Sequence, residues 1–134
     1  MQLTHIKGAT HTDSRGKLEY INDIDLTQVK RFYKITPADT SIIRAWQVHK
    51  IEVKWFHCIT GSFEVKIINL GTKEVSNYTL KAENMTVLYI PKNNANGFRA
   101  LEENSTLQVF SDKTLEESLK DGANFDLNHF GDIW

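Results

Sequence analysis

The sequence is poor in the features that mark secreted, membrane-spanning and nucleic-acid-binding proteins. It contains one cysteine in 134 residues, so Cys58 cannot form a disulfide within the chain. The apolar neighbours of Cys58 predict a buried thiol, because a reactive thiolate needs polar or cationic surroundings. Sixteen basic and seventeen acidic residues give a net charge of −1, which argues against a surface that binds a nucleic-acid backbone or an anionic membrane.

Long apolar runs are also missing. No window approaches the roughly 18 consecutive apolar residues that a membrane-spanning helix needs. Residues 1–10 contain no apolar segment of signal-peptide length. We therefore expect a cytoplasmic protein whose partners include neither nucleic acid nor a membrane.

What the chain does contain is a succession of short β-type runs. Hydrophobic residues make up 40% of the sequence, enough for the core of a single domain that spans residues 1–134. Turn residues separate the runs, which predicts an all-β fold with mainly antiparallel neighbours. The expected strands are residues 29–35, 41–48, 53–59, 62–70, 74–80, 86–90 and 106–110.

One of these runs has a clear two-residue period. Apolar and charged residues alternate from Phe63 to Ile67, which predicts a strand with one face in the core and the other in water. Gly61 comes just before this run and can adopt the backbone angles that a hairpin turn requires.

A helix is expected only near the end of the chain. Leu115 and Leu119 are four residues apart and a glycine follows them, which predicts one short helix at 114–120. The polar segment 93–97 and the carboxylates within 121–126 are expected to lie in exposed loops.

The residues with chemical potential gather around the segment from Arg44 to Lys50. Gln47 and His49 are two apart, so in a strand their side chains leave the same face. Lys54 follows in the next expected strand, and the three side chains would converge if the two strands were neighbours in a barrel. An imidazole titrates near neutral pH and suits a general base, whereas the Lys54 charge suits an oxyanion.

This segment resembles the first motif of the cupin superfamily, in which two histidines two residues apart precede an acidic residue and a glycine. The segment from Pro91 to Asn96 resembles the frame of the second cupin motif. The positions that hold a metal in metal-binding cupins are Gln47, His49, Lys54 and Asn96 here. Because an ammonium group repels a cation, the resemblance implies a cupin-type double-sheet β-sandwich, or jelly roll, without a metal or other cofactor.

Within the cupins the chain resembles the dTDP-4-dehydrorhamnose 3,5-epimerases and the related dTDP-4-keto-6-deoxyglucose 3,4-ketoisomerases. The resemblance runs from about residue 13 to the end of the chain. It is carried by Asp13-Ser14-Arg15-Gly16, Val29-Lys30-Arg31-Phe32-Tyr33, Arg44 to Lys50, Lys54 to Gly61, Ile90 to Phe98, and Gly131-Asp132-Ile133-Trp134. Each segment is short, but their order and spacing together are specific.

The resemblance implies an isomerase or epimerase that acts on a nucleotide-linked 4-keto-6-deoxyhexose in surface-polysaccharide precursor synthesis. In this chemistry a base removes a proton next to the ketone and an enediolate forms. The expected catalytic residues are His49 as base and Lys54 as oxyanion stabiliser. The expected substrate-binding residues are Arg44 on the pyrophosphate, Gln47 and Asn96 on sugar hydroxyls, Arg15 on the nucleotide, and Tyr33 as a stacking surface. A homodimer is expected, because the relatives commonly pair and edge strands need covering.

Two departures from the relatives leave a second interpretation open. Both relatives carry histidine where this chain has Gln47, and the epimerases also carry one where it has Asn96. A carboxamide cannot act as a base, so the chain could instead be a noncatalytic module that binds nucleotide sugars. The remaining pair, His49 and Lys54, favours 3,4-ketoisomerisation over double epimerisation, which needs access to two carbons and a placed acid.

Overall fold

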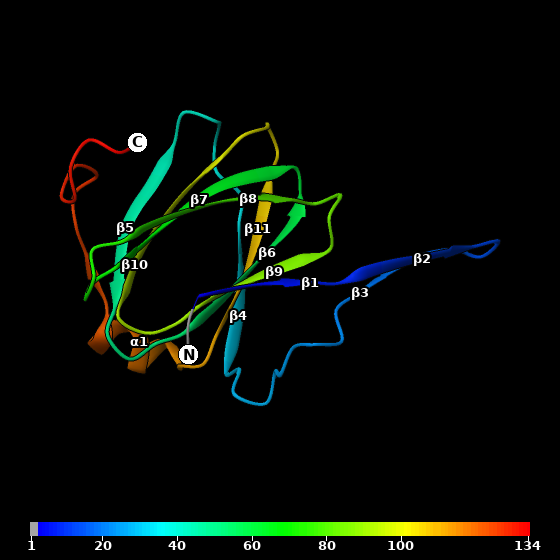
Figure 1. Ribbon diagram of the computed structural model, residues 1–134, viewed down its shortest axis with the longest axis horizontal. Coiled ribbons are helices and arrows are strands. Elements are labelled where there is room, and N and C mark those ends of the chain that lie inside the picture. Colours follow the sequence, from blue (N-terminus) through cyan, green and yellow to red (C-terminus); the bar gives the residue numbers. More distant parts are fainter. Residues whose placement is uncertain (1–2) are drawn as a thin grey trace.

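The computed structural model describes residues 3–134, which form two antiparallel five-stranded sheets packed face to face, a separate hairpin and one short helix (Figure 1). In strand order, the first sheet contains β1 (Thr4–Lys7), β9 (Thr86–Ile90), β6 (Lys54–Thr60), β11 (Thr106–Ser111) and β4 (Arg31–Ile35). The second contains β12 (Ala123–Asn124), β5 (Ile43–His49), β10 (Asn94–Ala100), β7 (Ser62–Asn69) and β8 (Val75–Lys81). The prediction of an all-β double-sheet sandwich is therefore confirmed.

The core lies between the sheets, where apolar side chains from both inner faces meet. Phe56 and Leu107 come from the first sheet, and Phe63, Val65 and Ile67 come from the second; each is at most 1% exposed. Full burial of such a side chain contributes about 1.5–3 kcal/mol. The alternation from Phe63 to Ile67 thus places its apolar residues in the core, as predicted.

The C-terminal segment covers the outer face of the second sheet. The Trp46 ring, 1% exposed, packs 5.4 Å from Phe130 and 5.8 Å from Trp134 between ring centres. Its indole N–H donates to the Leu127 carbonyl at 2.9 Å. Trp134 also lies 5.2 Å from the ammonium of Lys66. Because of this cover Lys66 is only 8% exposed, and the expectation that it faces water is wrong.

Strand β10 replaces the exposed loop that was expected at residues 93–97. The side chains from Asn94 to Phe98 are buried, because β10 lies between β5 and β7 in the middle of the second sheet. Asparagine and glycine disfavour strands on their own. Here hydrogen bonding to two neighbouring strands outweighs that preference.

Helix α1 (Leu115–Asp121) begins at a capping box. The Thr114 hydroxyl accepts from the Glu117 N–H, and the Glu117 carboxylate accepts from the Thr114 N–H. The predicted helix is confirmed, but its two leucines do not enter the core: Leu115 is 60% and Leu119 75% exposed. No helix in residues 3–134 has the length and apolar character needed to cross a membrane.

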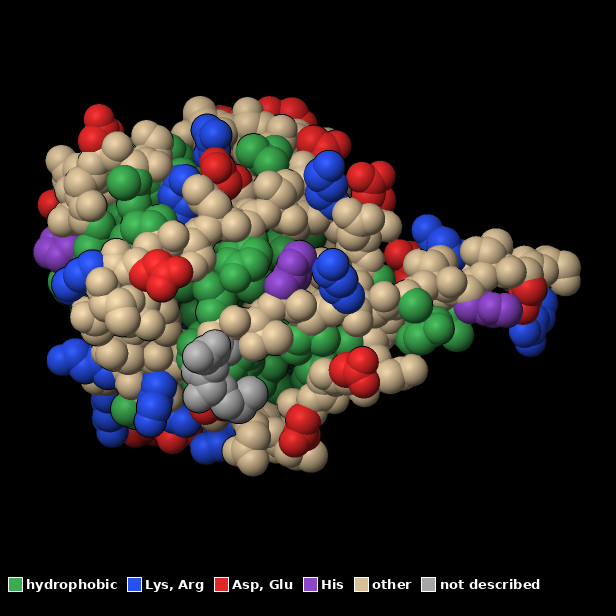
Figure 2. Space-filling model, in the orientation of Figure 1, with side chains coloured by type: hydrophobic (Ala, Val, Ile, Leu, Met, Phe, Trp, Pro, Cys, Tyr) green, Lys and Arg blue, Asp and Glu red, His purple; other side chains and the backbone are tan. Residues whose placement is uncertain are grey.

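A hairpin of β2 (Ala9–Asp13) and β3 (Gly16–Tyr20) stands away from the sandwich (Figures 1 and 2). Its strands pair with each other and not with either sheet. All five residues of β2 are exposed, and Leu18 on β3 is 60% exposed. The hairpin therefore buries little apolar surface within one chain.

Gly97 on β10 tests how closely the C-terminal segment packs. An added Cβ would lie 2.6 Å from the Ala45 Cβ and 3.0 Å from the Trp134 ring. We expect Gly97→Ala to lower the free energy of unfolding in urea by about 1–3 kcal/mol. Gly71→Ala is the control, since its added Cβ would meet only an exposed Asn69 oxygen at 3.3 Å. Equal losses in the two variants would contradict this account.

Candidate active site

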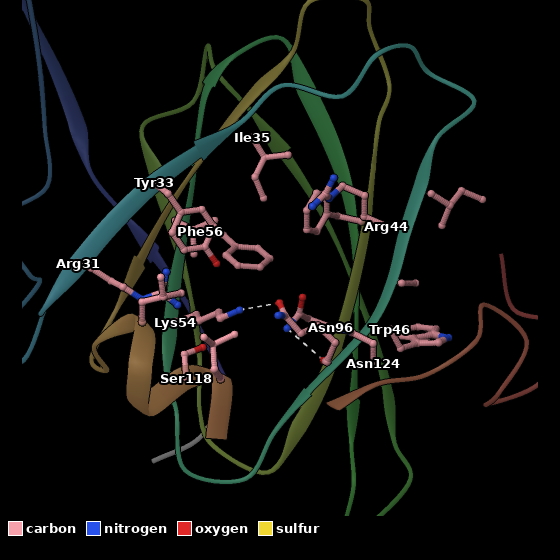
Figure 3. Close-up of a pocket in the computed structure, with 17 residues that line it drawn as sticks. Arg31, Tyr33, Ile35, Arg44, Trp46, Lys54, Phe56, Asn96, Ser118 and Asn124 are labelled. Carbon is pink, nitrogen blue, oxygen red and sulfur yellow. Dashed lines mark hydrogen bonds between the residues drawn. The ribbon is translucent and has the colours of Figure 1, made fainter. Parts of the chain in front are cut away.

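A cavity of about 500 Å³ opens between the two sheets, with α1 at its rim (Figure 3). Its volume lies in the range typical of small-molecule sites. Polar and apolar side chains from both sheets line it together with residues of α1. Among them are Arg31, Tyr33, Ile35, Arg44, Gln47, Lys54, Phe56, Asn96, Phe98, Leu115, Ser118, Leu119 and Asn124.

A bulge in β5 decides which of its side chains reach the cavity. Asn96 pairs with Gln47 and Phe98 pairs with Arg44, so β5 advances three residues while β10 advances two. In a regular strand Arg44 and Gln47 would point to opposite faces. The bulge allows both to line the cavity, while the Trp46 ring between them points to the other side of the sheet (Figure 3).

Lys54 enters the cavity from the first sheet and meets Gln47 from the second. Its Nζ donates to Oε1 of Gln47 at 2.7 Å (Figure 3), and Lys54 is 2% exposed. The two side chains converge although their strands are not neighbours, because β5 and β6 belong to different sheets and face each other across the cavity. Burial lowers the pKa of Lys54 to about 8, so a fraction of the molecules carries a neutral amine near neutral pH.

Asn96 and Gln47 form a continuous amide wall. They are directly paired residues on β10 and β5, and the Asn96 Nδ2 donates to the Gln47 backbone carbonyl at 3.4 Å. Both side chains line the cavity. Amides in this setting can exchange hydrogen bonds with hydroxyl groups but cannot take up a proton.

Strand β4 supplies a phenol and a guanidinium to the opposite wall. The Arg31 guanidinium lies 4.9 Å from the centre of the Tyr33 ring. Burial raises the pKa of Tyr33, so its hydroxyl keeps its proton at neutral pH. Arg44 is exposed at the cavity rim. Positive charges therefore surround the cavity, which suits an anionic ligand.

His49 lies outside the residues that line this cavity. It is 3% exposed, and its Nδ1 lies 3.2 Å from Oε1 of Glu52 and 3.5 Å from Oδ2 of Asp121. Burial lowers the pKa of His49 and the Lys54 charge lowers it further, while the two carboxylates act in the opposite direction. The ring thus contacts buried carboxylates instead of the cavity, which weighs against the predicted role of His49 as base.

Asp121 connects the end of α1 to the turn between β5 and β6. Its carboxylate accepts the backbone N–H groups of Lys50, Ile51 and Glu52 at 3.0, 3.1 and 2.9 Å. Its side chain is 4% exposed, so the expectation of an exposed loop is wrong at Asp121. Burial alone would raise the pKa of Asp121, but the three N–H groups and the nearby His49 lower it overall.

The same buried cluster contains one imidazole and two carboxylates, which are side-chain types that can bind a metal ion. Ligand atoms of His49, Glu52 and Asp121 all lie within 4.8 Å of one another. However, the other Glu52 oxygen accepts from Ser111 at 2.6 Å and lies 3.4 Å from the Arg31 guanidinium. A divalent cation would share this buried space with a guanidinium, which is electrostatically unfavourable. We therefore assign the cluster to charge balance and hydrogen bonding.

Arg15 is separated from the other predicted site residues, because it lies on the hairpin that pairs with neither sheet. It occupies the turn of the β2–β3 hairpin, with its Nη2 2.7 Å from Asp13 and its side chain 86% exposed. It is not among the described residues that line the cavity of its own chain.

Three residues of the site were missed in the sequence. Arg31 has a visible signal, because Arg31, Tyr33 and Ile35 follow a two-residue period and all line the cavity. Glu52 and Asp121 have none. Glu52 lies in the turn three residues after His49, and Asp121 lies at a helix end that only the tertiary fold brings to His49.

Comparisons with known proteins identify relatives of this arrangement. A family model described as FdtA: WxcM-like, C-terminal matches residues 1–127. No curated protein sequence matches the chain significantly.

Three solved structures illustrate the similarity in fold. One is a histidine-to-asparagine variant of the 3,4-ketoisomerase QdtA from Thermoanaerobacterium thermosaccharolyticum in complex with TDP-4-keto-6-deoxyglucose. This chain is 25% identical to it over 90% of this chain and 86% of QdtA, with a TM-score of 0.74. A 3,4-ketoisomerase from Helicobacter canadensis is 20% identical over 97% of this chain and 95% of its own, with a TM-score of 0.77. The rmlC epimerase of Mycobacterium tuberculosis is 16% identical over 98% of this chain and 74% of its own, with a TM-score of 0.83. The expected cupin fold and family resemblance are confirmed.

The burial of Lys54 predicts a specific dependence of stability on pH. Between pH about 8 and its ordinary pKa of 10.5, Lys54 is protonated in the unfolded chain but not in the folded one, so the folded state gains stability as the pH rises. Relative to Lys54→Met, the wild type should gain up to about 3 kcal/mol across this range in urea denaturation. The difference between wild type and Lys50→Met, which alters an exposed lysine, should stay constant. A constant difference for Lys54→Met as well would show that Lys54 titrates normally.

Proposed function

The chain belongs to the FdtA family of WxcM-like cupins, and on that premise we propose that it catalyses 3,4-ketoisomerisation of a TDP-linked 4-keto-6-deoxyhexose with Lys54 as the proton-transferring residue. One observation carries the proposal: the amine of Lys54 lies buried in the cavity with its pKa lowered to about 8. General bases work best when their pKa lies near the operating pH. The likeness to QdtA, which was captured with TDP-4-keto-6-deoxyglucose, supports this choice of substrate class.

The proposed reaction needs two proton transfers between carbon and one base. The neutral amine of Lys54 takes the proton from C3, the C3–H electron pair forms the C3–C4 double bond, and the C4 carbonyl oxygen becomes an enolate oxygen. The hydroxyl proton then passes from O3 to O4. The Lys54 ammonium returns its proton to C4, and the C3 carbonyl forms. The sugar is isomerised without any net gain or loss of protons or electrons.

The enediolate would be stabilised by the positive and hydrogen-bonding groups in the cavity wall. Arg31 lies against the Tyr33 ring at 4.9 Å, and the Tyr33 hydroxyl keeps its proton because burial raises its pKa. Donors fixed before the reaction stabilise developing charge more effectively than water does. We assign Tyr33 and Arg31 to this task, so Tyr33 acts as a donor in addition to offering the stacking surface expected from the sequence.

The other predicted binding residues keep their roles in the proposal. We assign Arg44, which is exposed at the rim, to the pyrophosphate, which a guanidinium can bind through two parallel hydrogen bonds. Gln47 and Asn96 form an amide wall suited to sugar hydroxyls. His49 becomes a residue that acts from behind the cavity, because its ring contacts Glu52 instead of the cavity.

A second candidate function is binding of the nucleotide sugar without turnover. It is favoured by the two amides, Gln47 and Asn96, at positions where the resemblance leads us to expect histidine. The amide of Gln47 also accepts a hydrogen bond from Lys54 at 2.7 Å, which would oppose reaction if Lys54 stayed protonated. The two functions therefore differ in one property, the ability of Lys54 to release and accept a proton.

Replacing Lys54 by arginine separates the two functions. We incubate the protein with TDP-4-keto-6-deoxyglucose in deuterated water and follow C3 and C4 by proton NMR. The wild type should form the 3-keto isomer with solvent deuterium at C3 or C4, and its rate should rise with pH through about 8 as Lys54 loses its proton. Lys54→Arg should lose at least about 100-fold of this rate, since arginine stays protonated.

The controls for this experiment test binding and position. Lys50→Arg changes an exposed lysine near the same turn and should leave the rate unchanged. TDP binding, measured by calorimetry, should persist in Lys54→Arg. Turnover that survives in Lys54→Arg would remove Lys54 from the reaction, binding without exchange in the wild type would establish the noncatalytic function, and deuterium at C5 would indicate an epimerase.

We further propose that the protein is a homodimer in which the β2–β3 hairpin contacts a second copy. The hairpin stands away from its own sandwich (Figure 2), and Leu18 on it is 60% exposed. Arg15 at its turn is 86% exposed. Pairing would bury this apolar surface, and it offers the route by which Arg15 could approach a nucleotide.

The dimer should dissociate when a charged residue replaces the apolar Leu18 on the hairpin. We expect the wild type to sediment with twice the mass of one chain, whereas Leu18→Asp should sediment as a monomer because a buried aspartate lacks a partner. Leu101→Asp is the control, since Leu101 is also exposed, at 41%, but lies outside the hairpin. A dimer that withstands Leu18→Asp would exclude the hairpin as the contact.

A further inference from the structure

Glu52 occupies an unusual position between the cavity and the buried cluster behind it. Its carboxylate is fully buried, with 0% side-chain exposure. One oxygen accepts from Ser111 at 2.6 Å and lies 3.4 Å from the Arg31 guanidinium. The other lies 3.2 Å from Nδ1 of His49. Glu52 therefore contacts a side chain of the cavity wall on one side and the buried histidine on the other.

The carboxylate is surrounded by groups whose charges it influences. Arg31 and Tyr33 face it from β4, His49 from β5 and Asp121 from the end of α1, while Lys54 follows it on β6 and Arg44 stands farther away at the rim. The Lys54 ammonium is favoured by Glu52 and, more weakly, by Asp121, whereas Arg31 disfavours it. Among the nearby acidic groups, Glu52 thus raises the pKa of Lys54 most, and Lys54 is the residue that we place at the reaction centre.

We propose that Glu52 is a positioning residue of this site: its carboxylate holds Arg31 in the cavity wall and supplies the negative charge that allows Lys54 to exist as an ammonium in a buried environment. Without this charge, burial and the Arg31 guanidinium would increase the neutral fraction of Lys54. A neutral lysine could take the C3 proton but would retain it poorly for delivery to C4. Delivery of the proton to C4 therefore depends on a residue that does not line the cavity.

The catalytic meaning of this inference rests on the proposed function, but its electrostatic content can be measured without substrate. A purely structural role makes the opposite prediction. If Glu52 only supported the fold, its removal would loosen the site, admit water to Lys54 and raise the Lys54 pKa toward its ordinary value. If Glu52 acts by its charge, its removal lowers the Lys54 pKa. The direction of the change decides between the two roles.

The experiment is an NMR titration of protein labelled with ¹³C at the lysine ε carbons. The Lys54 signal is assigned by its absence in Lys54→Arg. We expect Glu52→Gln to lower the titration midpoint of Lys54 by about one pH unit, a size typical for the loss of a nearby opposite charge. Glu64→Gln is the matched control, because Glu64 pairs with Arg99 at 2.8 Å on the outer side of β7 and should leave the midpoint unchanged. A midpoint that stays constant or rises in Glu52→Gln would overturn the proposal.

A second pair of variants covers the case in which Glu52→Gln fails to fold because Arg31 loses its carboxylate partner and keeps only its hydrogen bond to the Lys113 carbonyl. Arg31→Gln should raise the Lys54 midpoint, since it removes a positive charge. Adding Glu52→Gln to Arg31→Gln removes both charges together, and this double variant should titrate at a lower pH than Arg31→Gln alone. Equal midpoints in these two variants would also overturn the proposal.

Turnover separates this inference from the proposed function. If the wild type isomerises the sugar, the rise of rate with pH should move to lower pH in Glu52→Gln, by the same amount as the NMR midpoint. If the wild type shows no turnover while the midpoints shift as expected, the proposed isomerase function fails and the role of Glu52 in setting the charge of Lys54 stands.

Discussion

The geometry of the site depends on one buried carboxylate at the end of a helix. Asp121 accepts three consecutive backbone N–H groups from the turn between β5 and β6. That turn separates Gln47 from Lys54, which meet at 2.7 Å from opposite sheets. These three hydrogen bonds to one carboxylate connect the helix end to the turn and to the two strands that the turn joins. The same contact positions α1 so that Ser118 and the exposed leucines lie at the cavity rim.

The site arranges its charges in two layers. Cationic and hydrogen-bonding side chains line the cavity, whereas Glu52 and Asp121 lie buried behind them. The cavity therefore presents positive charge, which suits the anionic sugar nucleotide of the proposed function, while the buried acids offset the repulsion between those cations. This separation also explains the place of His49. Its ring lies beside two carboxylates in the second layer and is not among the side chains that line the cavity.

The sequence predicts the fold better than it predicts the site, because the two depend on different kinds of information. Strand periodicity is local, and it identifies the core strands through residues such as Phe63 and Ile67. The bulge that turns both Arg44 and Gln47 toward the cavity arises from pairing with β10, a strand whose asparagines give no β signal. The contact of Glu52 with Arg31 and that of Asp121 with Lys50 join residues 21 and 71 positions apart, and no pattern within one segment encodes them.

Gln47 occupies a position where histidine was expected and cannot take up a proton, but the cavity still contains a titratable residue, Lys54. Lys54 donates one N–H to Gln47 Oε1, and an amide oxygen can accept this bond from an amine as well as from an ammonium, although the ammonium forms the stronger bond. When Lys54 is neutral, the bond directs one N–H toward Gln47 and leaves the nitrogen lone pair free to point elsewhere in the cavity. A single base oriented in this way can serve two adjacent carbons, C3 and C4, on the same face of a sugar. Epimerisation at C3 and C5 makes a different demand, since each carbon must receive its new proton on the face opposite to the one that lost it. Lys54 is one buried amine on one wall, and that geometry fits the transfer of a ketone between neighbouring carbons.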